Sequence, residues 1–338
     1  MPPDPLPLVR VAGSHAEIGA QIGRATAAAV GRAAAAVTPA QLEAARPYRG
    51  ATERELPWLV EELDAVADGA GADRGAVFAA GIEELETAGA GEGACSDLVA
   101  RPPASVDGHL WVAHNNDLSP DVEPDVVAIE WRVPGDPVVF TIGIGPWISV
   151  GFNSAGLALT GNEVAPNDNR IGIPRLLHVR DILRRRTLDE AVDAALNPRR
   201  ASSYNTILSH RDGGVVNVEG SATDAELIRP GADGTLAHTN HYVSARMLPY
   251  EGDPEYAAGS AVRYRRALEW LAPGQITQHI LRRALKDHTG APHSLCRHPE
   301  HGSQSKTVFW CLADVTEGTV IYGRGNPCDS LDQRYAFD

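Results

Sequence analysis

The sequence predicts a layered α+β fold, in which helices are segregated from many largely antiparallel strands. Residues 1–90 have helical periodicity, whereas from Cys95 onwards short β-branched and aromatic runs are bounded by Gly, Pro, Asn or Asp. Amphipathic helical segments stand between the later runs. The sharpest change of composition falls at Ala94–Cys95, which suggests a helical N-terminal segment and a strand-rich remainder.

The composition is that of an ordinary globular protein, since the 338 residues are 43% hydrophobic and 22% charged. The net charge of −14 repels phosphate backbones, so nucleic-acid binding is not expected. The Ala-rich stretch 24–37 is interrupted by Arg32 and is too short and weakly apolar to span a bilayer. Four cysteines are too few for a disulfide scaffold, and residues 1–10 do not resemble a secretory signal. We therefore expect a cytoplasmic protein with no membrane partner.

The N-terminal helices are predicted from capping and periodicity. Ser14 is the expected N-cap of a helix over 14–37, because Glu17 follows at the capping-box spacing. An apolar stripe predicts a second helix over 53–70, and a third is expected over 77–87. The small residues of AGAGEGA, 88–94, predict a segment without helix or strand.

The later elements are predicted from their periodicity and from the turn residues that bound them. Strands are expected at 95–100, 110–118, 126–133, 138–144, 148–161, 203–210, 214–220, 307–315 and 319–323. Helices are expected at 173–185, 188–196, 261–271 and 277–288.

Cys95 is the candidate nucleophile because it directly follows the small-residue stretch and opens a strand-like run. On position alone, two interpretations stand: a small apolar core residue, as most intracellular cysteines are, or a reactive thiol. Other motifs of the chain favour the second.

Four separated motifs resemble one family when they are taken in order. They are GACS at 93–96, NND at 115–117, GFNSAGLALTGN at 151–162 and HTNH at 238–241. Together they resemble the acyl-CoA:6-aminopenicillanic acid acyltransferase family, which belongs to the N-terminal-nucleophile hydrolases and is distantly similar to penicillin V acylases and bile salt hydrolases. The resemblance covers about residues 10–328.

The resemblance implies an αββα sandwich, with two antiparallel sheets between helical layers, and a precursor that cuts itself before its nucleophile. Here the processing site would be Ala94–Cys95, which divides the chain into a helical segment 1–94 and a catalytic core 95–338 within one integrated globular unit. After the cut, Cys95 would supply the nucleophilic thiol and, through its α-amine with a pKa of about 7.7–8.0, the general base.

The resemblance also assigns roles to residues of the motifs. Asn162 and Asn240 match positions that stabilise the tetrahedral oxyanion. Asp117 matches the aspartate that holds the nucleophile in place, and Arg297 matches an arginine that supports processing and the charge network of the site. Further positions match the substrate-binding pocket, namely Asn115 and Asn116.

The implied function is a self-processing amidohydrolase or N-acyltransferase. It would act on an amide or acyl donor among small molecules, through a cysteine acyl-enzyme. This chemistry needs no metal and no organic cofactor, although acyl-CoA is a candidate co-substrate. The two pieces formed by the cut would remain partners of each other.

Three alternatives remain open from the residues. A zinc-dependent hydrolase is suggested by two histidine-rich loops, but their spacing matches no familiar zinc motif; the residues are His238, His241, His288, His293, Cys296, His298 and His301. A cysteine hydrolase with His114 as base is the second. The third is a non-catalytic binding descendant, because Asn116 and Leu118 stand where the family has Trp, and Ala94 stands where it often has Gly.

Overall fold

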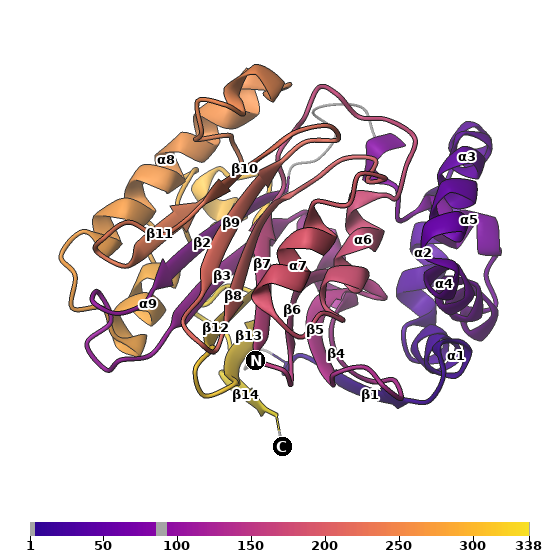
Figure 1. Ribbon diagram of the computed structural model, residues 1–338, viewed down its shortest axis with the longest axis horizontal. Coiled ribbons are helices and arrows are strands. Elements are labelled where there is room, and N and C mark those ends of the chain that lie inside the picture. The colour runs from indigo at the N-terminus through magenta and orange to yellow at the C-terminus, as the bar shows by residue number, and fades with distance from the viewer. Residues whose placement is uncertain (1–3, 86–92, 338) are drawn as a thin grey trace.

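Two β-sheets packed face to face form the centre of the computed structural model, which describes residues 4–85 and 93–337 (Figure 1). In this described part, the eight-stranded sheet has the order β1 (Leu8–Ala12), β4 (Val126–Arg132), β5 (Val139–Ile144), β6 (Trp147–Asn153), β7 (Leu157–Asn162), β8 (Asn205–His210), β9 (Val215–Gly220), β10 (Ala225–Ile228). The six-stranded sheet has the order β11 (Thr235–His238), β2 (Ala94–Ala100), β3 (Trp111–Leu118), β12 (Lys306–Asp314), β13 (Thr319–Arg324), β14 (Gln333–Ala336). Paired strands are antiparallel except β1 and β4, which run parallel.

Alternation of side chains along the strands builds two faces on each sheet. In β4, Val126 and Ala128 face the other sheet and pack with Val112 and Phe309, whereas Ile129 faces outwards to the helices. The strands of both sheets are therefore apolar on both faces, and each sheet needs a helical layer to cover its outer face.

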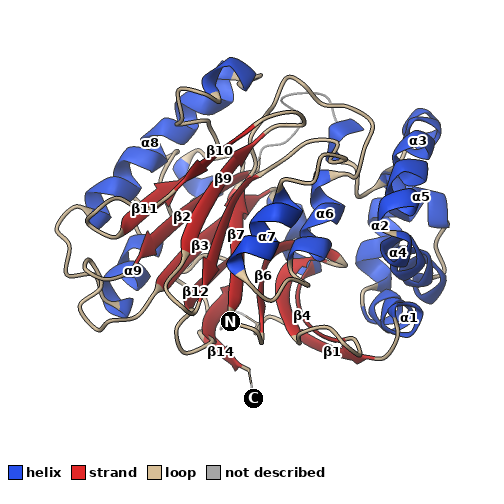
Figure 2. Ribbon diagram, in the orientation of Figure 1, coloured by secondary structure: helices blue, strands red, loops and turns tan. Residues whose placement is uncertain are grey.

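Helices cover both outer faces, as Figure 2 shows. On the eight-stranded sheet, α1 (His15–Ala25), α6 (Arg175–Ile182) and α7 (Leu188–Ala195) contact the strands, and α2 (Ala27–Ala36), α3 (Pro39–Glu55), α4 (Pro57–Ala70) and α5 (Arg74–Ala79) pack with other helices in the same apolar core. The six-stranded sheet packs against α8 (Pro254–Leu271) and α9 (Gln278–Leu285). Short 3-10 helices lie at Glu83–Leu85, Pro120–Asp125, Leu248–Tyr250 and Pro299–His301. The predicted αββα sandwich with a helical N-terminal segment is confirmed.

The helix boundaries correct several predictions in the N-terminal part. Ser14 caps α1 with the expected capping box to Glu17, but the helix predicted over 14–37 is divided at Thr26, whose hydroxyl donates to the Ile22 carbonyl. The helix predicted over 53–70 begins at Pro57. The helix predicted over 77–87 ends at Ala79, and residues 86–87, like 88–92 of the small-residue stretch, lie outside the described residues.

Each predicted strand coincides with an observed one, except that the run 148–161 is a hairpin of β6 and β7. The structure adds an unpredicted helix, α3, and unpredicted strands β1, β10, β11 and β14. β1 pairs with β4, and helices α1–α5 share one apolar core with the eight-stranded sheet. Across the described residues, no helix is long and apolar enough to cross a membrane.

Candidate active site

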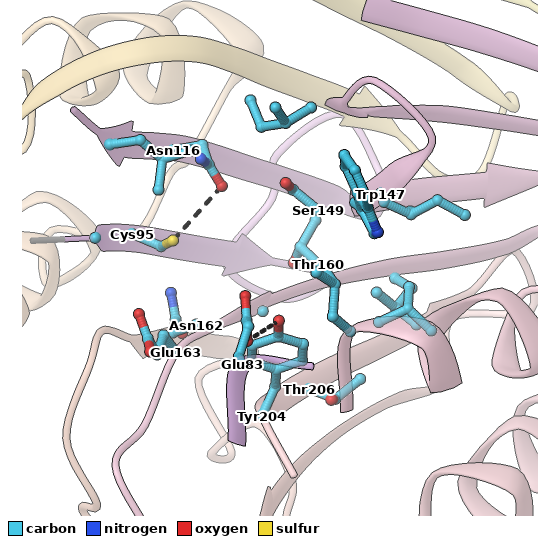
Figure 3. A pocket seen from close by; sticks show the side chains of 18 of the residues that line it. Glu83, Cys95, Asn116, Trp147, Ser149, Thr160, Asn162, Glu163, Tyr204 and Thr206 are labelled. Carbon is cyan, nitrogen blue, oxygen red and sulfur yellow. Dashed lines mark hydrogen bonds between the residues drawn. The ribbon is translucent and has the colours of Figure 1, made fainter. Parts of the chain in front are cut away.

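Cys95 is the second residue of β2, where the strand enters the sheet between β11 and β3. Its backbone N–H donates to Asn240 Oδ1 at 2.8 Å, and its thiol lies 3.6 Å from Asn116 Oδ1. Asn116 is directly opposite Cys95 in the antiparallel pairing, so the two side chains point to the same face. Figure 3 shows the two side chains next to each other on neighbouring strands, joined by this contact.

The thiol faces a cavity of about 350 Å³ between the two sheets and the α6 region. One part of its wall is apolar and includes Leu118, Val122, Ile144, Trp147, Ile148, Leu176 and Val179. Another part is polar: Tyr204 donates to Glu83 at 2.5 Å, and Glu83 also pairs with Arg175 at 2.7 Å. The arrangement combines a reactive atom with an apolar chamber, as expected of a small-molecule site.

His114 and Asp97 form a fully buried pair beside Cys95. His114 Nδ1 lies 3.0 Å from Asp97 Oδ1, and its Nε2 lies 3.3 Å from Asn116 Oδ1, the oxygen that also accepts from the Cys95 thiol. Burial alone would lower the pKa of His114, but the Asp97 carboxylate and the thiol outweigh it and raise that pKa well above its usual value. Burial raises the pKa of the Cys95 thiol, and His114 opposes this shift. His114 is therefore a stronger base than a free imidazole, and it holds its proton to a higher pH.

Asn162, at the end of β7, connects this pair to a second buried pair. Its Nδ2 donates to Asp97 Oδ2 at 2.8 Å, and its Oδ1 lies 3.0 Å from His238 Nδ1. His238 Nε2 in turn lies 2.7 Å from Glu219 Oε1. Gly161 lets β7 approach β8 here, because a Cβ would lie 2.3 Å from the Asn205 carbonyl oxygen. Asn162 therefore has a fixed orientation at the cavity wall.

Asn240 follows β11 and is held from both ends of its side chain. Besides the Cys95 N–H, its Oδ1 accepts a hydrogen bond of 2.6 Å from Arg263 Nη2, and its Nδ2 donates to the Glu163 carbonyl at 3.0 Å. Arg263 comes from α8 and is buried, with burial and Arg297 lowering its pKa while Asp117 opposes them. The position of Cys95 is thereby fixed by two elements that lie far from it in sequence.

Asp117 lies opposite Ala94 in the β2–β3 pairing and is fully buried. Its Oδ1 accepts a hydrogen bond of 2.6 Å from Thr307, and its Oδ2 is buried without a hydrogen-bond partner in the described residues. Burial raises the pKa of this carboxyl, while Arg297 and Arg263 act in the opposite direction. Asp117 Oδ2 therefore lies next to Ala94 without a partner among the described residues, and such a buried carboxylate oxygen is suited to bind a cationic amine.

A second cavity, of about 430 Å³, lies on the Ala94 side of the strand. It is lined mainly by polar groups, including Tyr256, Arg263, His293 and Arg297. Tyr256 donates to the carbonyl of Gly93 at 2.5 Å. The Ala94–Cys95 bond thus lies between a cavity with an apolar wall on the thiol side and a polar cavity on the other.

The structure brings most of the sequence-predicted residues to this strand. Asn116 and Asn162 line the cavity with Cys95, Asn240 binds the Cys95 backbone, and Asp117 and Arg297 lie on the Ala94 side. Asn115 is not brought to the cavity, because neighbouring strand residues point to opposite faces and its Nδ2 donates to the carbonyls of Leu285 and Leu295.

Sequence reasoning missed Asp97, Glu163 and Arg263. Only Asp97 had a usable signal, since it stands two residues after Cys95 and therefore on the same face of a predicted strand. The pairing of His114 with it was not visible from sequence.

The histidine-rich loops do not meet at one place. His238 is bound by Asn162 and Glu219, and His241 lies 2.8 Å from Ser260 Oγ. His293 lines the second cavity. In contrast, His288, Cys296 and His298 converge with a cysteine far along the chain, and their side chains could hold a metal ion.

The αββα sandwich is the fold of the N-terminal-nucleophile hydrolases, which defines the class of this chain. Residues 105–329 match the family model described as acyl-coenzyme A:6-aminopenicillanic acid acyl-transferase, and the chain belongs to this family. Membership indicates an amide hydrolase or acyltransferase. A search of curated proteins found no match.

Solved structures with a similar arrangement include an N-acylethanolamine-hydrolyzing acid amidase ortholog from Caenorhabditis elegans. Its sequence identity is 14% and its TM-score is 0.46, and the match covers 66% of this chain and 93% of that one. A variant of conjugated bile acid hydrolase from Clostridium perfringens has 14% identity and a TM-score of 0.48 over 72% and 97%. Penicillin V acylase from Agrobacterium tumefaciens has 13% identity and a TM-score of 0.41 over 68% and 83%.

Proposed function

We propose that the protein is a self-processing N-terminal-cysteine amidohydrolase of small molecules, with cleavage between Ala94 and Cys95. The observation that carries the proposal is the placement of Cys95. Its thiol faces a cavity with an extensive apolar wall, while its own nitrogen is held by Asn240 and its preceding residue lies against Asp117. A backbone nitrogen already held by a side-chain acceptor is suited to become a free amine.

The first step needs a base other than the α-amine, because that amine does not yet exist in the uncut chain. We assign this role to His114. Its Nδ1–H would donate to Asp97, so that Nε2 accepts the thiol proton, and Asn116 Oδ1 at 3.3 Å then accepts from the protonated Nε2. Asp97 stabilises the resulting imidazolium, and the sulfur attacks the Ala94 carbonyl carbon.

The cut follows by loss of the Cys95 nitrogen from that carbon. The nitrogen takes up a proton as the C–N bond breaks, which leaves Ala94 bound to the sulfur as a thioester. Water then hydrolyses the thioester and regenerates the thiol. The products are a C-terminal carboxylate on residue 94 and an α-amine on Cys95, next to the unpartnered Asp117 Oδ2.

In the processed enzyme, the α-amine would serve as base for attack on a substrate amide. Asn162 and Asn240 are the proposed oxyanion donors. Among residues 4–85 and 93–337, each of their Nδ2 groups has one acceptor, which would leave a second N–H of each for the oxyanion. Arg297 and Arg263 would balance the charge of Asp117.

The cavity indicates which half of the substrate binds on the thiol side. Its apolar wall favours an apolar acyl group, and among the described residues its charged lining consists of the acidic Glu83 and Glu163, with no Lys, Arg or His. Hydrolysis and acyl transfer share the acyl-enzyme and differ in whether water or an amine accepts the acyl group. We propose hydrolysis, with acyl-CoA as an alternative donor and with no metal or organic cofactor in the reaction.

The pieces 1–94 and 95–338 would remain associated after cleavage. The helices of the first piece and strands of the second bury one common core, and β1 is hydrogen-bonded to β4. Residues 1–94 therefore act as a subunit and not as a discarded leader.

The test is the intact mass of freshly purified wild type beside Cys95→Ala. The proposal expects wild type to give pieces of about 10 and 26 kDa, from the 94- and 244-residue split at a cysteine-led bond, and Cys95→Ala to stay at 35.9 kDa. Cys311→Ala is a matched control, because Cys311 is also buried in the six-stranded sheet and lies opposite His114 in β12. Cleavage of Cys95→Ala would refute the assignment of the nucleophile.

A second candidate is an uncut cysteine hydrolase that uses His114 as its permanent base, and the buried His114–Asp97 contact favours it. It predicts a full-length wild type that hydrolyses amides and loses activity in His114→Ala. A binding descendant predicts a full-length chain that neither hydrolyses amides nor becomes acylated at Cys95. The two outcomes are separated by mass spectrometry after incubation with an activated acyl ester.

A further inference from the structure

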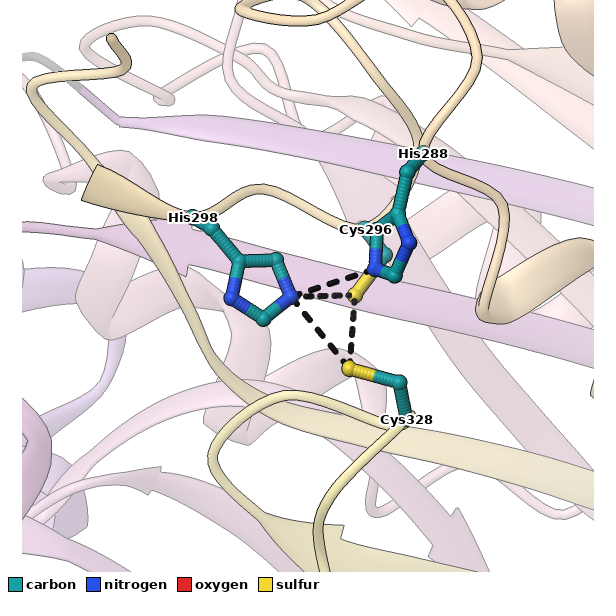
Figure 4. A group of neighbouring side chains, drawn as sticks. All are labelled: His288, Cys296, His298 and Cys328. Atoms are coloured by element: carbon teal, nitrogen blue, oxygen red, sulfur yellow. Dashed lines mark hydrogen bonds between the residues drawn. The ribbon is translucent and has the colours of Figure 1, made fainter. Parts of the chain in front are cut away.

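Four metal-binding side chains converge away from the thiol cavity, at the end of the loop that follows α9. Cys296 and Cys328 have their sulfurs 3.8 Å apart, and His298 Nε2 lies 3.4 Å from the first sulfur and 3.3 Å from the second. His288 Nε2 completes the group at 3.2 Å from His298 Nε2. All four atoms lie within 4.8 Å of one another, and Figure 4 shows the four side chains pointing to a common centre.

Hydrogen bonds do not explain this convergence. His298 Nε2 is close to three groups at once, yet a ring nitrogen carries either one proton or one lone pair. Thiols are weak donors and weak acceptors, so they are poor partners for the remaining contacts. Cys296 is fully buried and His298 nearly so, which makes unsatisfied groups costly here.

We propose that this group, the His288–Cys296–His298–Cys328 cluster, binds one Zn²⁺ ion in a structural site. Zn–S bonds of about 2.3 Å and Zn–N bonds of about 2.0–2.1 Å at tetrahedral angles place ligand atoms about 3.8 Å (S–S), 3.6 Å (S–N) and 3.4 Å (N–N) apart. Four of the six separations, at 3.8, 3.3–3.4 and 3.2 Å, are close to these values, and the two between His288 and the sulfurs lie within 4.8 Å. A tetrahedral S₂N₂ set is typical of zinc.

Groups around the cluster support metal ligation. His298 Nδ1 lies 3.2 Å from Glu300 Oε1, so a carboxylate orients the ring with Nε2 towards the centre, as is common for metal-bound imidazole. Asn326 Nδ2 lies 3.5 Å from Cys296 Sγ and can donate to a thiolate. His301 packs edge-on against His288, at 5.5 Å between ring centroids.

The site would be structural, because four protein ligands leave no open position for water or substrate. This distinguishes it from the catalytic zinc alternative raised by the sequence, and it replaces the expectation of no metal. Cys328 was outside that sequence-based group because it stands thirty residues beyond His298.

The ion would fasten the loop 286–305 to the segment after β13. Arg297 lies between two ligands in sequence, its backbone N–H donates to Thr307, and its carbonyl accepts from Asn326. Thr307 in turn holds Asp117. Zinc would thereby fix Arg297 and Asp117 at the active site. This last step rests on the proposed function, whereas the metal site itself does not.

The experiment measures metal in the full-length wild type, produced without a histidine tag and in zinc-supplemented medium. Plasma mass spectrometry is expected to find one zinc per chain after gel filtration. Replacement by Co²⁺ is expected to give intense visible bands and thiolate charge-transfer absorption of tetrahedral coordination. These readouts do not depend on activity, so they stand whether or not the protein cleaves itself.

Two variants separate ligation from folding. Cys328→Ser is expected to lose the zinc, whereas His301→Asn, a histidine that touches the cluster without belonging to it, is expected to retain it. If Cys328→Ser does not fold, the site is tested instead by zinc uptake of wild type that has been stripped with a chelator. Reduced wild type that contains no zinc and takes up none overturns the proposal, and so does an intact mass that is lower by the two hydrogens lost in a Cys296–Cys328 disulfide.

Discussion

Replacement of Asp97 by asparagine tests the proposed role of His114 with little change of shape. Both carboxylate oxygens of Asp97 are acceptors, one for His114 Nδ1 at 3.0 Å and one for Asn162 Nδ2 at 2.8 Å. Asparagine offers one acceptor oxygen and one donor NH2 group. Either His114 Nδ1 or Asn162 Nδ2 must therefore face that NH2 group. Because Asn162 is also held by His238 and Asn205, the amide is expected to face His114.

The consequence for His114 is a change of tautomer. An amide opposite Nδ1 requires that nitrogen to accept, which moves the proton to Nε2 and removes the base from the Cys95 thiol. Loss of a general base typically reduces a rate about 10²- to 10⁴-fold. The substitution is also expected to lower the free energy of unfolding by about 1–3 kcal/mol, the usual cost of an unsatisfied buried polar group.

The assay is the rate at which full-length chain disappears after synthesis, followed by intact mass, together with thermal unfolding. Asp181→Asn is the matched control, because Asp181 is also buried and bonded to Arg185 but lies on α6. It is expected to lose comparable stability and to cleave at the wild-type rate. Folded Asp97→Asn that cleaves as fast as wild type would show that His114 is not the base.

Two further predictions concern stability. Thr307→Val removes the donor to Asp117 and the acceptor for the Arg297 backbone N–H. The free energy of unfolding is expected to fall by about 1–3 kcal/mol for each group left unpaired. Denaturant unfolding measures this change, and an unchanged midpoint would contradict it. Burial lowers the pKa of His178 to about 4 from its usual 6.5, so the folded chain binds this proton more weakly than the unfolded chain. Stability is therefore expected to fall by about 3 kcal/mol as the pH decreases from above 6.5 to 4, and His178→Gln should abolish this component of the pH profile.

The sequence predicted the elements whose signals are local. The capping box of Ser14 and Glu17 marks the start of α1 correctly, because both partners lie within one helical turn. Thr38 and Gln41 form the same motif at the start of α3, but that helix was missed. Its buried residues are few and, apart from Tyr48, small, and Pro47 lies within it, so the apolar stripe is weak.

Edge strands were missed for a related reason. β10, at the edge of the eight-stranded sheet, spans four residues, too few to show a period. β1 has five residues and is recognised only by its pairing with β4, more than a hundred residues away. Tertiary pairing of this kind has no local signature.

The candidate site divides in the same way. Cys95, Asn162 and Asn240 were found because each lies in a motif, whereas Arg263 lies in an ordinary amphipathic helix and reaches Asn240 only after α8 packs on the sheet. Cys328 likewise meets His298 only through the fold. Spacing in sequence could not select either residue.

The parallel pairing of β1 with β4 has a consequence for the thermodynamics of a cut chain. While the chain is intact, β1 and β4 belong to one molecule, and unfolding is independent of protein concentration. Once the Ala94–Cys95 bond is broken, the same hydrogen bonds and the same core join two polypeptides, so unfolding becomes a dissociation that obeys mass action. Dilution would then act as a denaturant, and the shared core would be measurable as the affinity of one polypeptide for the other.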